Sequence, residues 1–306
     1  MKTDSALSRR TFLSTLAAAG AAAAIGSSPT AQAAGGKTGR NKIIAFSKPF
    51  QDLSPDDTAD FVADVGWDGI ECPVRAGGQI LPERVEEDLP KMVEALKKRN
   101  LELTVVTTDI KNPSQPLTQK ILHTAKRLGI TQYRVAFWTY DAKTPIPKQL
   151  DEIRAELRDL TALNKELGMQ AGFQNHSGGT RVGAAGWDVY ELVKDLDPKY
   201  TGVFFDIGHA AIEGGLSWPT QARLLRPYYM GVYAQDALWN KTATGWKNEW
   251  CPLGQGIVSR SFFTNLMKTG YTGMFSQKHE YKWNSRAEMK TAMKKDLAVF
   301  REWLAV

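Results

Sequence analysis

Several strongly polar residues follow directly on short apolar runs of the chain. The run 203–205 ends in Asp206, and His209 follows three residues later. A carboxylate and an imidazole so close in sequence can exchange protons or bind a metal ion. The same arrangement recurs at four other places: Glu71, Gln174–Asn175–His176, Gln235–Asp236 and Lys278–His279–Glu280. Three of the four histidines therefore follow such runs, which predicts that distant segments build one site.

Eight short runs rich in β-branched and aromatic residues alternate with helical patterns. The runs are apolar throughout, as expected for parallel strands that are buried on both faces. They are KIIAFS, DGIECPV, LELTVVTT, QYRVAFW, MQAGFQ, TGVFFD, MGVYAQ and TGMFSQKHE. This alternation predicts an α/β fold, a single-domain (β/α)8 TIM barrel. An open doubly wound sheet would place a glycine fingerprint after the first strand, and AFSKPFQDLS contains none.

The N-terminal residues have the composition of a targeting segment. Residues 1–33 contain Arg9 and Arg10, an alanine-rich apolar stretch and the small residues Ala31–Ala33. This segment resembles a bacterial twin-arginine export signal, which implies a periplasmic or extracellular protein without stable membrane insertion after cleavage. An uncleaved segment would instead tether the chain to a membrane. Residues 34–41 are interpreted as a flexible leader and 42–306 as the barrel.

The remaining composition excludes some function classes and leaves two questions open. The formal net charge of +6 comes from scattered basic residues, so we expect no nucleic-acid partner. Two cysteines, Cys72 and Cys251, make no disulfide framework, and their pairing is open. Homo-oligomerisation is open as well.

Six short motifs occur in a characteristic order: GWDGIE, QNHSGG, FDIGHA, AQD, PLGQG and HEY. In this order and spacing they resemble the xylose-isomerase-like TIM-barrel superfamily, and within it the sugar phosphate isomerase/epimerase family. The resemblance spans roughly residues 42–304. It implies an isomerase or epimerase that moves a proton next to a sugar carbonyl, with a divalent cation held by Glu, Asp, His and Glu from the last four strands.

Three of those four ligand positions differ in this chain. By position the ligands fall on Gln174, Asp206, Tyr233 and Lys278. A rearranged set of Gln174, Asp206, His209 and Glu280 would still offer donors to Mn, Mg or Zn. A metal-free site is the alternative, in which the Lys278 ammonium replaces the charge of the cation opposite Asp206. A purely structural Lys278–Asp206 ion pair is a third interpretation.

The resemblance also suggests roles for the other candidates. Glu71, Lys278 and Glu280 are the expected catalytic residues. A small-molecule carbohydrate would contact Trp138, Asn175, His176, His209, Asp236 and Trp239. The segment 238–256 is expected to form a lid over the pocket. The sequence thus predicts an exported sugar isomerase/epimerase-like enzyme; a non-catalytic carbohydrate-binding barrel and a keto-glycoside lyase that uses the same carbanion are the alternatives.

Overall fold

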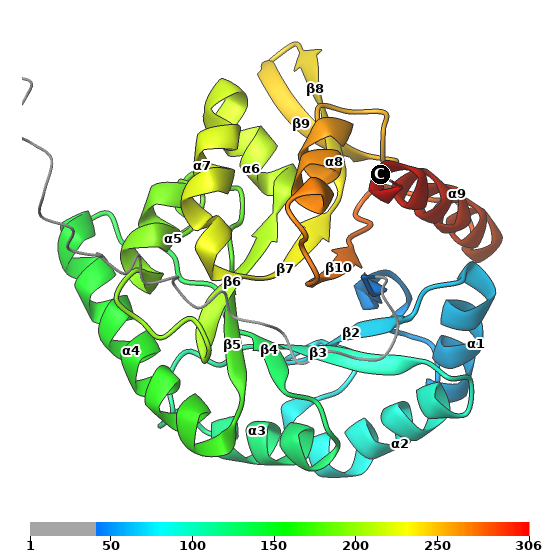
Figure 1. Ribbon diagram of the computed structural model, residues 1–306, viewed down its shortest axis with the longest axis horizontal. Helices are drawn as coiled ribbons and strands as arrows, with labels where there is room; N and C mark the ends of the chain where they lie inside the picture. Colours follow the sequence, from blue (N-terminus) through cyan, green and yellow to red (C-terminus); the bar gives the residue numbers. More distant parts are fainter. Residues whose placement is uncertain (1–40, 306) are drawn as a thin grey trace, which may run out of the picture. The chain divides into compact units, whose positions relative to one another are not determined.

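The computed structural model describes residues 41–305, in which eight parallel strands close into a barrel (Figure 1). Around the barrel the strands follow the order β1-β10-β7-β6-β5-β4-β3-β2. Their bounds are β1 Ile43–Phe46, β2 Gly69–Val74, β3 Glu102–Thr108, β4 Gln132–Arg134, β5 Gln170–Gln174, β6 Thr201–Asp206, β7 Tyr229–Ala234 and β10 Met274–Gln277. This confirms the predicted (β/α)8 TIM barrel. The predicted export signal lies outside the described residues.

Helices follow the strands and surround the barrel (Figure 1). They are α1 Pro55–Val65, α2 Val85–Lys97, α3 Thr118–Arg127, α4 Ile146–Leu167, α5 Gly186–Val193, α6 Ile207–Gly214, α7 Trp218–Leu225, α8 Arg260–Lys268 and α9 Arg286–Leu304. Helices α1 and α9 begin at serine caps, Ser54 and Ser285, whose side chains accept a backbone N–H. None of the helices within 41–305 combines the length and apolarity that a membrane span requires.

An apolar layer fills part of the barrel interior. The cluster comprises Ile44, Val105, Phe204, Met230, Tyr233 and Met274. Phe204 fits only because position 172 is glycine: a Cβ atom there would lie 2.3 Å from the phenyl ring. The Phe204 ring in turn stacks on Tyr233, with 5.2 Å between ring centroids. The polar side chains that face the barrel interior lie toward the C-terminal ends of the strands, where they can contact a ligand.

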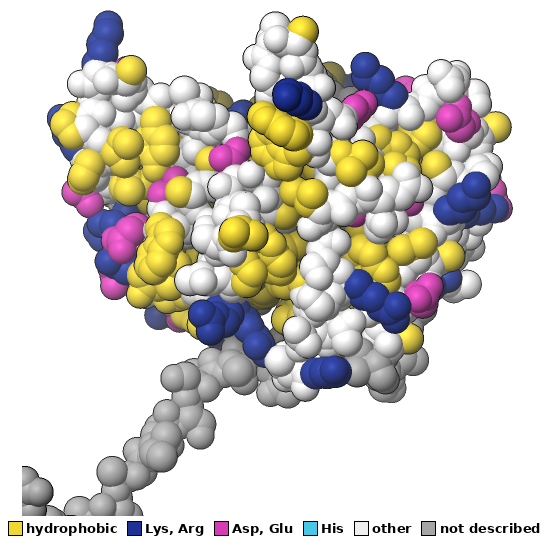
Figure 2. All heavy atoms as spheres, turned by 90° about the horizontal axis from the view of Figure 1, so that it is seen from above, with side chains coloured by type: hydrophobic (Ala, Val, Ile, Leu, Met, Phe, Trp, Pro, Cys, Tyr) yellow, Lys and Arg dark blue, Asp and Glu magenta, His cyan; other side chains and the backbone are white. Residues whose placement is uncertain are grey.

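A two-stranded antiparallel sheet stands outside the barrel. Its strands are β8 (Asp236–Thr242) and β9 (Gly245–Cys251), so most of the segment expected to be a lid loop is a β-hairpin. Trp239 and Trp246 on this hairpin are 41% and 65% exposed. Figure 2 views the molecule from the top of Figure 1, where the hairpin projects, and shows several patches of exposed hydrophobic side chains. Cys72 and Cys251 are both buried and unpaired.

Candidate active site

Glu71 is the centre of a buried hydrogen-bond network at the C-terminal end of the barrel. The hydroxyl groups of Thr107, Tyr233 (3.1 Å) and Ser276 (2.9 Å) donate to its carboxylate. Lys278 Nζ lies 2.8 Å from both carboxylate oxygens. These residues come from β2, β3 and β7 and from the end of β10, so closure of the barrel is what brings them together.

The Lys278–Glu71 pair differs from the sequence interpretation, which placed Lys278 opposite Asp206. Both side chains are shielded from solvent, with 3% and 0% exposure. Burial lowers the pKa of Lys278 to about 8, although the Glu71 carboxylate opposes this shift. Burial acts to raise the pKa of Glu71, but the charge and hydrogen bonds of Lys278 and the bond from Thr107 outweigh it, and the pKa is lowered. The pair is therefore charged at neutral pH.

Asp206, at the end of β6, is fully buried and surrounded by donors. Its Oδ2 accepts from Gln174 Nε2 and Gln235 Nε2, both at 2.8 Å. Its Oδ1 accepts from the backbone N–H of His209 at 3.1 Å, which makes Asp206 the N-cap of α6. Burial raises the pKa of Asp206, while these hydrogen bonds oppose the shift.

Two imidazole rings stack beside Asp206. The centroids of His176 and His209 are 3.8 Å apart, and Ser177 contacts both rings. His176 Nδ1 lies 2.9 Å from the Ser177 carbonyl oxygen, which only accepts, so this nitrogen carries the proton and Nε2 is left unprotonated. The Ser177 hydroxyl lies 2.8 Å from His209 Nδ1. Burial lowers the pKa of His176 to about 4 and that of His209 to about 3, so both rings are neutral at pH 7.

The donor set does not fit a divalent cation. The expected ligands were Gln174, Asp206, His209 and Glu280, but the two Asp206 oxygens face N–H donors. Glu280 lies beyond the end of β10 and pairs with Lys48 at 3.5 Å. The ammonium of Lys278 cannot ligate a metal. Within residues 41–305, no three His, Cys, Asp or Glu side chains are grouped to hold a metal ion. The expected four-residue set is therefore not assembled.

Trp138 and Asn175 contact the scaffold of the barrel. The Trp138 ring stacks on Phe173 with 5.7 Å between centroids, and its Nε1–H donates to Glu156 of α4 at 2.7 Å. Asn175 Nδ2 donates to the backbone carbonyl oxygen of Asp206 at 2.8 Å, and its Oδ1 accepts the backbone N–H of Asp206 at 2.7 Å. Both side chains fix elements of the barrel to one another, and their contact with a carbohydrate stays a prediction.

Asp236 organises the segment that follows the hairpin. Its carboxylate accepts four backbone N–H groups, those of Ala237, Gly254, Gly256 and Val258. Gly256 is required here because a Cβ atom would lie 2.2 Å from the Ala237 carbonyl oxygen. Of the hairpin residues, Trp250 approaches the imidazoles, with its ring edge-on to His209 at 4.9 Å. Asp236 thus positions the hairpin, and its carboxylate is not available for substrate.

Replacement of Asp236 by alanine is expected to cost about 2–4 kcal/mol of unfolding free energy, because four backbone donors, two of them in buried hydrogen bonds, lose their acceptor. Hydrogen exchange should speed up at residues 252–258, since these amides are held by Asp236. Chemical denaturation and amide-exchange mass spectrometry measure the two effects. Asp236→Asn retains one carbonyl acceptor and should lose less unfolding free energy than Asp236→Ala. Unchanged amide exchange in Asp236→Ala would contradict the role of Asp236 in holding this segment.

Arg134, at the end of β4, was not singled out from the sequence. Its side chain points into the barrel and is 2% exposed, close enough to Glu71 to interact with the charge of its carboxylate. Its guanidinium carbon lies 4.3 Å from the centroid of the Phe137 ring. The signal was a charged residue inside the otherwise apolar run QYRVAFW, which forms the second strand after the one that carries Glu71.

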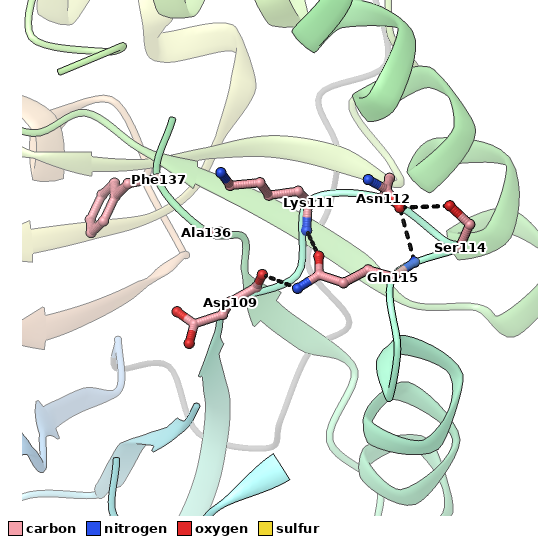
Figure 3. A pocket seen from close by; sticks show the side chains of 7 residues that line it. All are labelled: Asp109, Lys111, Asn112, Ser114, Gln115, Ala136 and Phe137. Carbon is pink, nitrogen blue, oxygen red and sulfur yellow. Dashed lines mark hydrogen bonds between the residues drawn. The ribbon is translucent and has the colours of Figure 1, made fainter. Parts of the chain in front are cut away.

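A surface groove of about 720 Å³ is formed by the segments that follow β3 and β4 (Figure 3). Residues between Asp109 and Gln115 form one wall, and Ala136 and Phe137 form the other. Phe137 therefore contacts both the groove and the buried guanidinium. His176 also contacts Phe137, edge-on with 4.6 Å between ring centroids, so one side chain of the groove lies against the imidazole pair.

Comparison with known proteins agrees with this architecture. Residues 59–303 match the family described as Xylose isomerase-like TIM barrel. A 3-keto-D-glucoside 4-epimerase from E. coli has a TM-score of 0.66 at 16% identity, covering 86% of this chain and all of that one. A D-allulose 3-epimerase from Methylomonas has 0.66 at 14%, covering 87% and 98%. A Mycobacterium smegmatis protein of this type, in complex with magnesium, has 0.62 at 18%, covering 87% and 98%. No curated protein sequence matches the chain.

Proposed function

The chain belongs to the xylose isomerase-like TIM barrel family, and from this premise we propose that it moves a proton next to the carbonyl group of a sugar or keto-sugar. Isomerisation or epimerisation is the proposed outcome. The observation that supports it is the Lys278–Glu71 pair: an ammonium group, held by a buried carboxylate, stands at a position where the family resemblance expects a metal ligand.

In the proposed reaction Lys278 supplies the positive charge. Proton removal from carbon drives negative charge onto the carbonyl oxygen, and a preorganised ammonium stabilises that charge. Glu71 is a positioning residue, because it is completely buried and fully occupied by donors. We assign the proton acceptor to the half-buried His176, whose Nε2 is unprotonated. Glu280, paired with Lys48 at the rim, has no role in this scheme.

A deuterium-exchange experiment tests the proposed reaction. Incubation with keto-sugars in D₂O should place deuterium at the carbon next to the carbonyl, which NMR detects. Because the residues present do not fit a divalent cation, EDTA or dipicolinate should leave the exchange rate within about twofold of the untreated value. A rate lost on chelation and restored by added Mn²⁺ or Mg²⁺ would contradict the metal-free scheme. A metal-dependent epimerase serves as the positive control for chelation.

Gln174 and Tyr233 stand where the family resemblance expects metal ligands, and this difference supports one alternative, a carbohydrate-binding barrel without catalysis. In that case calorimetry detects sugar binding, but no sugar takes up deuterium. A keto-glycoside lyase would take up deuterium and also release the leaving group, so product analysis separates it from an epimerase. The twin-arginine motif at Arg9 and Arg10 further supports action outside the cytoplasm, on sugars met there.

A further inference from the structure

Arg134 is a buried cation without hydrogen-bond partners. The residue is 2% exposed, and its Nε and Nη1 atoms are buried with no acceptor within the described chain. Nearly all buried polar groups in folded proteins have a partner, and an unpaired buried charge is especially costly. The guanidinium contacts an aromatic face, Phe137, but a ring face satisfies no N–H of the guanidinium plane.

The nearby acidic groups leave this charge uncompensated. Glu71, the nearest buried carboxylate that acts on Arg134, is committed to Lys278. Asp109 is exposed at the groove and accepts the backbone N–H of Ala76. No carboxylate within residues 41–305 forms an ion pair with Arg134. Arg75 adds further positive charge near it.

The Phe137 ring that the Arg134 guanidinium contacts also lines the groove described above. Phe137 and Lys111 line this groove, and Figure 3 shows both side chains on it. The guanidinium carbon of a second arginine, Arg181, lies 4.8 Å from the Phe137 ring centroid. Lys111 therefore lines the groove, Arg134 and Arg181 both contact the Phe137 ring that lines it, and the groove has one exposed carboxylate, Asp109.

We propose that Arg134 is an anion subsite that binds the carboxylate of an acidic sugar, so that the substrate is a uronate or keto-aldonate; this rests on the proposed function. A planar carboxylate matches the donors of a guanidinium, and desolvation inside the barrel strengthens the charged hydrogen bonds. Binding of the carboxylate also fixes the sugar chain relative to Lys278 and His176.

Calorimetry with matched ligands tests the subsite. D-glucuronate, D-galacturonate and D-mannuronate are compared with their neutral hexoses, and with glucose 6-phosphate. At least one uronate should bind tenfold or more tightly than its hexose. Arg134→Met should abolish this difference in affinity, and Arg134→Lys should retain part of it. Arg127→Gln, at the exposed end of α3, is the control and should retain the full difference. Equal binding of every acid and hexose, absence of uronate binding, or preference for the phosphate overturns the proposal.

A stability measurement separates a ligand-binding arginine from a structural one. Because the charge has no partner in the free protein, Arg134→Met should fold and unfold at a higher midpoint than the unmodified chain. A lower midpoint would show that Arg134 stabilises the free protein and would overturn the inference. Uronate binding without deuterium uptake would contradict only the proposed reaction; deuterium uptake from neutral keto-sugars with no preference for acids would contradict only the subsite.

Discussion

Replacing Lys278 by methionine is expected to lower the unfolding free energy by about 3–5 kcal/mol, because the substitution leaves the Glu71 carboxylate charged, buried and unpaired. Thr107, Tyr233 and Ser276 would still donate to Glu71, but none of them neutralises it. Glu71→Ala should cost a similar amount, since it leaves the Lys278 ammonium without its partner. Urea denaturation at pH 7 measures both losses.

The double variant Glu71→Gln/Lys278→Met is the control for this prediction. Glutamine retains an acceptor for the three hydroxyl donors, and no charge remains at the pair. Removing both partners of a buried ion pair is often nearly neutral. The double variant should therefore recover most of the stability lost in either single variant. If its loss equals the sum of the two single losses, the residues act independently and the pair is not coupled.

The same lysine should govern turnover. In the Glu71→Gln/Lys278→Met background, which is expected to fold, we predict that deuterium exchange falls by about 10²–10³-fold, as when a preorganised oxyanion donor is removed. The pH dependence of the rate shows which protonation state of Lys278 is active. The reaction needs the ammonium form, and burial lowers the pKa of Lys278 to about 8. His176, the proposed base, is unprotonated above its pKa of about 4, so the rate should be maintained between about pH 4 and pH 8 and decline above pH 8.

Lys278→Arg is the matched control for the pH dependence. A guanidinium stays protonated throughout the accessible range, so this variant, although slower because its geometry differs, should show no decline near pH 8. A rate that instead rises above pH 8 would mean that neutral Lys278 is the reactive form, as a base or an amine nucleophile. That result would contradict the electrophilic role proposed for it.

The barrel and the strand-end residues could be predicted from the sequence because each depends on local patterns. Continuous apolar runs identify buried parallel strands, and polar residues at their ends must lie on one rim. His176, Asp206 and Lys278 were found in this way. Glu71 was found by the same pattern, although it lies inside β2, which continues to Val74. Pairing across the barrel could not be predicted in the same way: Lys278 meets Glu71, 207 residues earlier, rather than Asp206.

The errors at Glu280 and Arg134 have different physical causes. Alternation of side chains places residues 278 and 280 on the same side only while the strand continues, and β10 ends at Gln277. The chain then leaves the sheet, and Glu280 turns to Lys48. Arg134 was missed because an inward-facing charge inside a strand looks like an interruption of an apolar run. Only the missing hydrogen-bond partners of its guanidinium reveal it.

The state of the two cysteines bears on the proposed export of the chain. Cys72 belongs to β2 and Cys251 ends β9, and neither is covalently linked to the other. No oxidising enzyme is thus needed to complete residues 41–305, and reducing conditions remove no bond from them. A barrel of this kind can reach its final form in a reducing cytoplasm and keep it in an oxidising space, as transport of an already folded cargo would demand.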